Sequence, residues 1–320
     1  MGEMREKDDG EGMSGTRKEL TGVPGLERLV VVERTGSTND DLRSALTGVD
    51  GRLDLRAAAA WPHISALWAR RQDAGRGRAG RRWITPPGSA LTVSFVLRPL
   101  VPAAALAWLP LLAGLAARDV VDAILISARA PWRARTKWPN DVVLVPNERA
   151  GEGIAAGAGA GTGGGAGAAA VPVPAEIPGW GRARKVAGVL AELIPTAGGI
   201  GTRTSAGGAG TANAPGAADA DRGAACAVVL GIGVNTGQSE SELPVPWATS
   251  LRLAGARVEP RALLEPLSAR LDELVTAWEA GEGDPDAGDG ALGAALRRAC
   301  TTLGRRVRVD APDGVLRGTA

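Results

Sequence analysis

The chain has 320 residues, of which 44% are hydrophobic and 22% are charged, and its formal net charge is +2. This length allows one large domain and a small one, and so small a charge gives no argument for nucleic-acid binding. The two cysteines, Cys226 and Cys300, have no metal-ligand or disulfide spacing. The first 20 residues lack a signal peptide's apolar segment, and the longest apolar run, 101–117, is shorter than a membrane span. We therefore expect a cytoplasmic protein without a membrane partner.

The first elements in chain order are a polar tail, a strand and a helix. Residues 1–25 are polar and Gly-rich, which predicts disorder. Residues 29–33 are β-branched and predict a strand, and 36–42 read as a turn and N-cap that lead into a helix. A second strand is predicted at 64–69. His63, which precedes it, is the only histidine and has no nucleophile motif as a partner, so we expect it to be structural.

The segment from Gln72 to Trp83 is rich in glycine and arginine and stands between two strand-like runs. Glycines let a backbone approach a ligand closely, and arginines present planar charged groups that suit carboxylate and phosphate. The segment therefore predicts a loop that binds a small anion. An Arg/Gly-rich RNA-binding segment and a solvated turn are the alternatives.

The middle of the chain reads as strands around one long helix. Residues 91–97 alternate with period two, like a half-buried strand, and 106–121 predict an apolar helix. Residues 142–145 and 186–193 predict neighbouring strands, and 228–235 predict another, with two glycines where a ligand or backbone can approach. Two Gly/Ala-rich stretches, at about 150–181 and 197–224, resemble flexible insertions in loops.

The C-terminal part predicts two helices and the beginning of another unit. Apolar residues recur at helical spacing over 263–278, which indicates an amphipathic helix. An acidic linker at 281–290 and a short helix at 291–299 follow. Residues 303–309 read as the first strand of something new, and 300–320 are too few to complete a domain.

Lysine is rare in this chain, which has 33 arginines and 4 lysines. Two of the lysines lie in the N-terminal tail, which leaves Lys137 and Lys185 for the folded body. A chain so biased toward arginine places lysine where a compact ammonium is needed, unless the two are survivors on the surface. Both precede apolar runs that read as buried strands, which favours the functional interpretation.

Five short motifs together resemble the biotin–protein ligases, specifically the form without an N-terminal DNA-binding domain. They are Gly36–Asn39, Gln72–Trp83, Lys137–Asp141, Lys185–Leu193 and Gly231–Asn235, in the family's order. The resemblance covers roughly residues 28–280 and implies an α+β fold, with a class II synthetase-like mixed sheet and helices over 26–299. It also implies that 300–320 begin a small SH3-like β-barrel, here incomplete.

The resemblance also implies roles for particular residues. Lys185 and Arg78 would be catalytic. The biotin-binding residues would be Ser37, Thr38, Asn39, Gln72, Arg76, Gly77, Arg78, Lys185 and Gly188. The ATP- or adenylate-binding residues would be Arg78, Arg81, Trp83, Lys137, Asn140, Asp141 and Asn235. Asp73 departs from the small hydroxyl residue that is common in the family at this position.

The implied reaction joins biotin to ATP as biotinyl-AMP and then transfers biotin to a lysine of a biotin carboxyl carrier domain of an acyl-CoA carboxylase. Magnesium is expected on the triphosphate, with Asp141 as an outer partner or only a turn cap. No nucleic-acid partner is expected, and the chain is a monomer or a homodimer.

Three rival functions remain open on the sequence. A lipoate–protein ligase shares the fold and the adenylation chemistry, although the Gly-Arg-Gly-Arg loop favours biotin. A non-catalytic relic of a ligase would retain biotin binding only. An RNA-binding protein would use the Arg/Gly loop, but one Phe and no Tyr leave it without the usual stacking aromatics.

Overall fold

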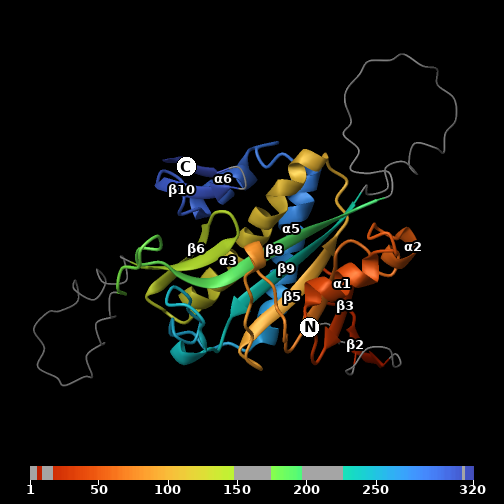
Figure 1. Cartoon of the computed structure of the whole chain (residues 1–320), viewed down its shortest axis with the longest axis horizontal. Coiled ribbons are helices and arrows are strands. Elements are labelled where there is room, and N and C mark those ends of the chain that lie inside the picture. Colours follow the sequence, from red (N-terminus) through yellow and green to blue (C-terminus); the bar gives the residue numbers. More distant parts are fainter. Residues whose placement is uncertain (1–5, 9–16, 148–173, 197–225, 312–313) are drawn as a thin grey trace, which may run out of the picture.

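The computed structural model describes residues 6–8, 17–147, 174–196, 226–311 and 314–320 (Figure 1). Its centre is a nine-stranded sheet in the order β1-β2-β3-β4-β5-β9-β8-β7-β6. β3 and β4 run parallel, whereas the other neighbouring pairs are antiparallel. The strands are β1 (Glu6–Asp8), β2 (Arg17–Leu20), β3 (Arg28–Val32), β4 (Ser65–Ala69), β5 (Ala90–Leu97), β6 (Trp132–Lys137), β7 (Asp141–Pro146), β8 (Arg184–Pro195) and β9 (Cys226–Asn235).

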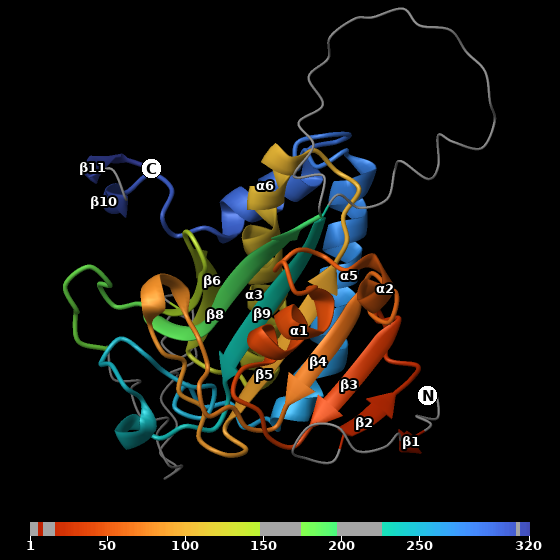
Figure 2. The ribbon, with the colours of Figure 1, turned by 45° about the vertical axis from the view of Figure 1, so that its right-hand side comes forward.

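Helices cover both faces of this sheet, as Figures 1 and 2 show. The larger core lies under two long apolar helices, where Trp278 is fully buried. A smaller core lies on the opposite face, under the N-terminal helices, and includes Leu42 and Leu46. The larger core involves α3 (Leu109–Ser127), α5 (Leu264–Ala280) and α6 (Ala291–Ala299), and the smaller one α1 (Thr38–Leu46) and α2 (Leu55–Ala58). The predicted α+β fold, a mixed sheet packed against helices, is thereby confirmed.

The expected period-two strand at 91–97 is β5, but its environment differs from the expectation. Every residue of β5 is buried, so the strand is not half-exposed. Its apolar residues Leu91, Val93, Phe95 and Leu97 face the larger core. Thr92 and Ser94 line a cavity on the opposite face instead of meeting solvent. The alternation of apolar and polar residues thus correctly predicted that β5 has an apolar and a polar face. The polar face is buried by other parts of the fold instead of facing solvent.

The predicted disorder of residues 1–25 was wrong for the end of that segment. Residues 17–20 form β2, which pairs with β3 from Arg17↔Val32 to Leu20↔Leu29. Polar composition predicted disorder here, whereas an available backbone edge on β3 supplies the hydrogen bonds that order β2. Residues 1–5 and 9–16 lie outside the described residues.

The strands on either side of the two Gly/Ala-rich stretches are neighbours in the sheet. β7 pairs with β8, as predicted, and β8 pairs with β9. Most of both predicted insertions lies outside the described residues, except 174–181, where Ile177 and Gly181 form a short bridge.

The last described segment is a two-stranded antiparallel sheet of β10 (Arg306–Ala311) and β11 (Gly314–Thr319). The beginning of an SH3-like barrel at 300–320 stays a prediction. Among the described residues, no helix combines the length and apolar character that a membrane crossing requires. His63 lies outside the cavity lining, where its Nδ1 accepts the Arg98 backbone N–H at 2.9 Å and its Nε2 lies 3.6 Å from Glu279.

Candidate functional site

A cavity of about 320 Å³ lies against the face of the sheet that carries α1. It brings together segments that are distant in the sequence: the start of α1, the arginine loop (residues 75–83), and parts of β5, β8 and β9. Of the residues predicted for the site, its lining includes Ser37, Thr38, Asn39, Gln72, Arg76, Gly77, Arg78, Arg81, Trp83, Asn140, Asp141, Lys185, Gly188 and Asn235.

Polar side chains at the N-terminus of α1 form a hydrogen-bonded row in this cavity. Ser37 caps the helix by accepting the Asp40 backbone N–H at 3.4 Å. Gln72 Oε1 accepts from the Thr38 N–H at 2.8 Å and lies 3.0 Å from its hydroxyl oxygen. Ser37, Thr38 and Asn39 are all buried. Buried polar groups in such a row are held in fixed directions, which suits recognition of a small polar ligand.

The two glycines predicted for close approach on β9 each accommodate a side chain of the site. A Cβ on Gly231 would overlap the amide oxygen of Asn39. A Cβ on Gly233 would lie 2.5 Å from Cε2 of the Trp83 indole. Both glycines therefore let site side chains lie directly on the backbone of β9.

A β-bulge directs Lys185 into the cavity. Val142 pairs with Ala187 but Val143 pairs with Lys185, so Val186 is an extra residue in β8. Both Val186 and Ala187 face the larger core, whereas Lys185 and Gly188 line the cavity. A regular strand would put Lys185 on the same face as Ala187, and the bulge instead turns it toward the site.

Lys185 contributes its ammonium group to the cavity wall. Its Nζ lies 2.6 Å from Oδ1 of Asp141 and 5.7 Å from the centre of the Trp83 ring. A Cβ on Gly188 would lie only 3.0 Å from the same Nζ, so the glycine leaves room for the ammonium. Three residues thus hold the ammonium of Lys185 in place without closing it off, since its side chain remains 23% exposed.

The arginine loop is tied at its base and carries exposed cations at its tip. The Trp83 N–H donates to the Gly75 carbonyl at 2.8 Å, and the Gly77 N–H donates to the Arg81 carbonyl at 2.7 Å. At the tip, Ala79 and Gly80 have φ of 55° and 70°, in the left-handed region. A second cavity lies between this loop and Leu190.

The arginines of the loop divide into one that is paired and three that are not. Arg76 forms ion pairs with Asp40 and, at 2.8 Å, with Glu192. Partial burial opposes its charge, but these carboxylates raise the pKa of Arg76. In the part of the chain that the structure describes, Arg78, Arg81 and Arg82 have no carboxylate partner. Those three cations therefore remain available to a ligand.

The remaining predicted residues are placed as follows. Asn140 donates to the Val189 carbonyl at 2.8 Å, and Asn235 donates to the Thr249 carbonyl at 2.9 Å. Lys137 is outside the lining; its Nζ lies 4.5 Å from the centre of the Trp180 ring, which stacks on Trp247. Its role in nucleotide binding stays a prediction.

Asp73, which departed from the pattern of the family, turns toward two arginines outside the cavity. Its carboxylate accepts from Arg34 at 2.5 Å and from Arg71 at 2.9 Å. The hydrogen bond from Arg34, supported by Arg71, lowers the pKa of Asp73. This negative charge is therefore neutralised before it can oppose an anion in the cavity.

Several residues of the site carried no signal in the sequence. Glu192 lies within the Lys185–Leu193 motif but was assigned no role, and Asp40 read as part of a helix start. Trp247 and Gln238 line the cavity from segments that carried no motif. Among these residues, only Glu192 could have been noticed from the sequence, because a carboxylate within a buried apolar strand needs a partner.

The residues that line the cavity suit a ligand that has a neutral polar group at one end and a negative charge at the other. The polar row around Thr38 offers fixed donors and acceptors, and Lys185 with the unpaired arginines offers positive charge. The described residues include no group of three or more metal-ligating side chains. The chemistry that these residues support is the stabilisation of negative charge, as on a phosphate or a carboxylate.

Comparison with known proteins identifies relatives of this chain. Residues 53–204 match the model of the biotin/lipoate A/B protein ligase family. A biotin–[acetyl-CoA-carboxylase] ligase of Mycobacterium tuberculosis is 29% identical over 93% of this chain and 80% of the relative. A ligase of the same description from Paracoccus denitrificans is 37% identical over 38% of this chain and 44% of its own length. The biotin protein ligase of Aquifex aeolicus, solved with biotin and ATP, shares the fold with a TM-score of 0.53, 20% identity and coverage of 92% and 87% of the two chains.

Proposed function

Because this chain belongs to the biotin protein ligases of the biotin/lipoate A/B protein ligase family, we propose that it forms biotinyl-5′-AMP and transfers biotin to a lysine of a biotin carboxyl carrier domain. The observation that carries this proposal is the shared cavity of the polar row, Lys185 and the arginine loop. Its acceptor would be an acyl-CoA carboxylase, and the names of two relatives specify acetyl-CoA carboxylase.

The first step joins two anions. A carboxylate oxygen of biotin attacks the α-phosphorus of ATP, the bond to the bridging oxygen breaks, and pyrophosphate leaves. The main obstacle is repulsion, so fixed cations that face the α-phosphate lower the barrier. Lys185 supplies one, held by Asp141 at 2.6 Å, and the unpaired Arg78 supplies another.

In the second step the neutral lysine amine of the acceptor attacks the acyl carbon of the mixed anhydride. The bond from this carbon to the phosphate oxygen breaks, AMP leaves, and the nitrogen gives up a proton to water as biotin becomes an amide. The same cations stabilise the departing phosphate. Trp83 and Asn235, which line the cavity with Lys185, are the residues we assign to the nucleotide. Arg76, already paired with two carboxylates, serves to hold the loop.

Magnesium would enter as part of the ATP complex. The cavity lining of the described residues carries two carboxylates, Asp141 and Glu242, and each is engaged, by Lys185 and by Ser239 respectively. Such a donor set does not form an all-protein magnesium cage, so phosphate oxygens and water would supply most ligands. When bound, the ion neutralises charge on the phosphates.

Exchange of labelled pyrophosphate into ATP tests this function. We expect exchange that depends on biotin and is absent with lipoate. Exchange with lipoate alone would replace the proposal by a lipoate ligase. Biotin binding without exchange would indicate a binding protein, and salt-dependent RNA retention with neither would support the RNA-binding alternative.

We expect Arg78→Gly to release the adenylate about 10- to 150-fold faster, because one charged hydrogen bond contributes roughly 1.5–3 kcal/mol. Arg78 has no carboxylate partner in the described structure, so its loss removes a ligand contact and leaves the loop tied at its base. Escaped adenylate should also label lysines of a bystander protein. Filtration of enzyme loaded with labelled biotin measures both effects.

Arg129→Gly is the matched control, since Arg129 is an exposed residue with φ of 52°, a conformation that glycine adopts freely. Retention of the adenylate by Arg78→Gly as tight as that of wild type would contradict a role for Arg78 in holding it.

A further inference from the structure

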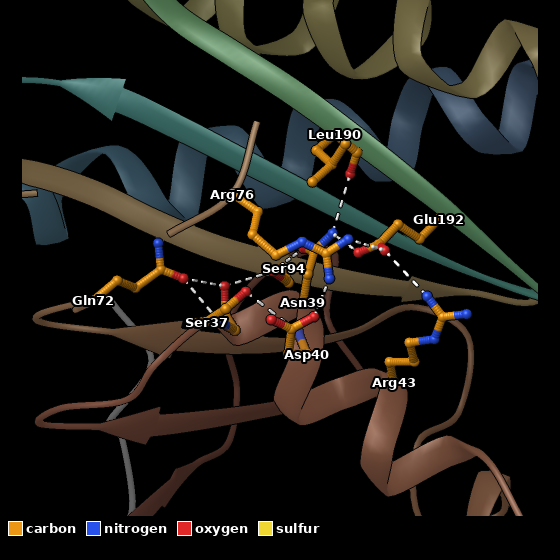
Figure 3. Close-up of polar contacts among 10 residues, drawn as sticks. Ser37, Asn39, Asp40, Arg43, Gln72, Arg76, Ser94, Leu190 and Glu192 are labelled. Carbon is orange, nitrogen blue, oxygen red and sulfur yellow. Dashed lines mark hydrogen bonds and ion pairs between the residues drawn. The ribbon is translucent and has the colours of Figure 1, made fainter. Parts of the chain in front are cut away.

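Glu192 joins the polar row to the arginine loop (Figure 3), and although it lies within the Lys185–Leu193 motif, no role was predicted for it. Its side chain on β8 is only 12% exposed. It accepts from Asn39 Nδ2 at 2.8 Å, from Arg76 at 2.8 Å and from Arg43 at 3.3 Å. A carboxylate that is paired with two arginines can only accept hydrogen bonds.

Because Glu192 can only accept, it fixes the donor and the acceptor of each hydrogen bond in the row that runs from Glu192 through Asn39 and Ser94 to Thr38. The amino group of Asn39 must face Glu192, so its Oδ1 faces Ser94 and accepts the Ser94 hydroxyl proton at 2.6 Å. Ser94 has then used its single proton. The hydrogen bond of 2.6 Å between the Ser94 and Thr38 hydroxyls must therefore run from Thr38 to Ser94.

The row ends with a hydroxyl oxygen whose own proton is committed. The Thr38 hydroxyl has one proton and two neighbouring acceptors, Ser94 Oγ at 2.6 Å and Gln72 Oε1 at 3.0 Å, so this proton stays within the row whichever oxygen accepts it. Both lone pairs of Thr38 Oγ1 then remain to accept an N–H from a ligand. A cyclic urea, as in biotin, carries N–H groups of this kind.

We propose that Glu192 is a positioning residue for the biotin site, which fixes the amide of Asn39 and thereby keeps Thr38 Oγ1 as an acceptor toward the ligand. This inference rests on the function proposed above and assigns Glu192 no contact with biotin. Gly231 contributes, because a side chain there would displace the Asn39 amide from this arrangement.

Glu192→Gln should reverse the row. Arg43 and Arg76 favour the amide oxygen of the new glutamine, which turns its amino group toward Asn39. Asn39 then flips, Ser94 accepts from it, and Ser94 donates to Thr38. The Thr38 oxygen has lost one of its lone pairs to Ser94.

The test is a swap of charge and amide between the two positions. Glu192→Gln should raise the KM for biotin about tenfold, the loss expected for one hydrogen bond of about 1.4 kcal/mol, with kcat and the KM for ATP changed less than threefold. Asn39→Asp alone sets two carboxylates face to face and should raise the biotin KM further. In the double variant, the glutamine at 192 donates and the aspartate at 39 accepts, so the hydrogen bond between the two positions is present with its direction reversed. That aspartate can also accept the Ser94 hydroxyl proton, and the KM for biotin should return to within about threefold of wild type.

Glu273→Gln is the matched control, because Glu273 is a 69% exposed acid of α5 that pairs with Arg270 outside the cavity lining; its biotin KM should stay at the wild-type value. A double variant no better than Glu192→Gln would overturn the inference, as would a loss confined to kcat. Wild-type exchange with biotin separates these results from a failure of the proposed function itself. If Asn39→Asp does not fold, the KM-against-kcat split of Glu192→Gln decides alone.

Discussion

Lys185→Ala is expected to lower the rate of biotin-dependent pyrophosphate exchange by about 10²–10³-fold, as for the loss of one preorganised donor to a developing anion. The loss has two sources. The substitution removes a fixed positive charge, and it leaves Asp141, 2.6 Å from the missing Nζ and only 15% exposed, without its counter-ion. An uncompensated carboxylate in the cavity wall would repel both biotin and ATP.

The two sources can be separated by adding Asp141→Asn to Lys185→Ala. The double variant should recover part of the lost substrate binding but not the rate of exchange. Lys18→Ala is the control, since Lys18 is an exposed lysine of β2 outside the cavity. Exchange at the wild-type rate in Lys185→Ala, with the fold intact by circular dichroism, would remove Lys185 from the mechanism.

Gly233→Val is expected to weaken binding of both substrates by about 5- to 150-fold, the equivalent of the 1–3 kcal/mol that overpacking typically costs. A Cβ at this position lies 2.5 Å from Cε2, 2.6 Å from Cζ2 and 2.8 Å from Nε1 of Trp83. The indole must move off β9, and the space beside it is the cavity. Isothermal titration with biotin and with ATP measures the loss.

Gly318→Val is the matched control, because Gly318 is also a strand glycine, yet a Cβ there would have no described atom within 4 Å beyond its chain neighbours. It should leave both affinities unchanged. If Gly233→Val binds biotin and ATP with wild-type affinity, the Trp83 indole can move off β9 without entering the cavity, and the prediction is wrong.

Patterns of neighbouring residues predicted the long helices and most strands of this fold, but not β2, β6 or α2. The helical spacing from Leu263 to Trp278 is α5, and the alternation of 91–97 is β5. The order of the strands in the sheet, with β9 between β5 and β8, depends on pairing across long stretches of sequence and had no local signal. Polar residues 17–20 read as a tail for the same reason, since only β3 makes them a strand.

The sequence singled out residues of the cavity lining where a position needs a special residue type, and the roles predicted for them stay predictions. Glycine at 231 and 233 and arginine at 78 were conspicuous because few residues tolerate or supply what those positions need. Glu192 and Asp40 act on other side chains of the protein, so their role appears only once Arg76 is seen between them. Alternation counted back from Gly188 would even have placed Lys185 on the core side, because the bulge at Val186 interrupts it.

The extra residue at Val186 also determines where β8 can change in length. A deletion inside a strand normally exchanges its two faces for all residues on one side of the deletion. Deleting Val186 instead leaves Lys185 opposite Val143 and Ala187 opposite Val142, now as a regular ladder. The shortened strand would lose one buried valine but keep its ammonium toward the site. β8 is therefore expected to tolerate a one-residue deletion at this position, whereas deletion of Val189, in the regular part of the ladder, would invert the strand and abolish exchange.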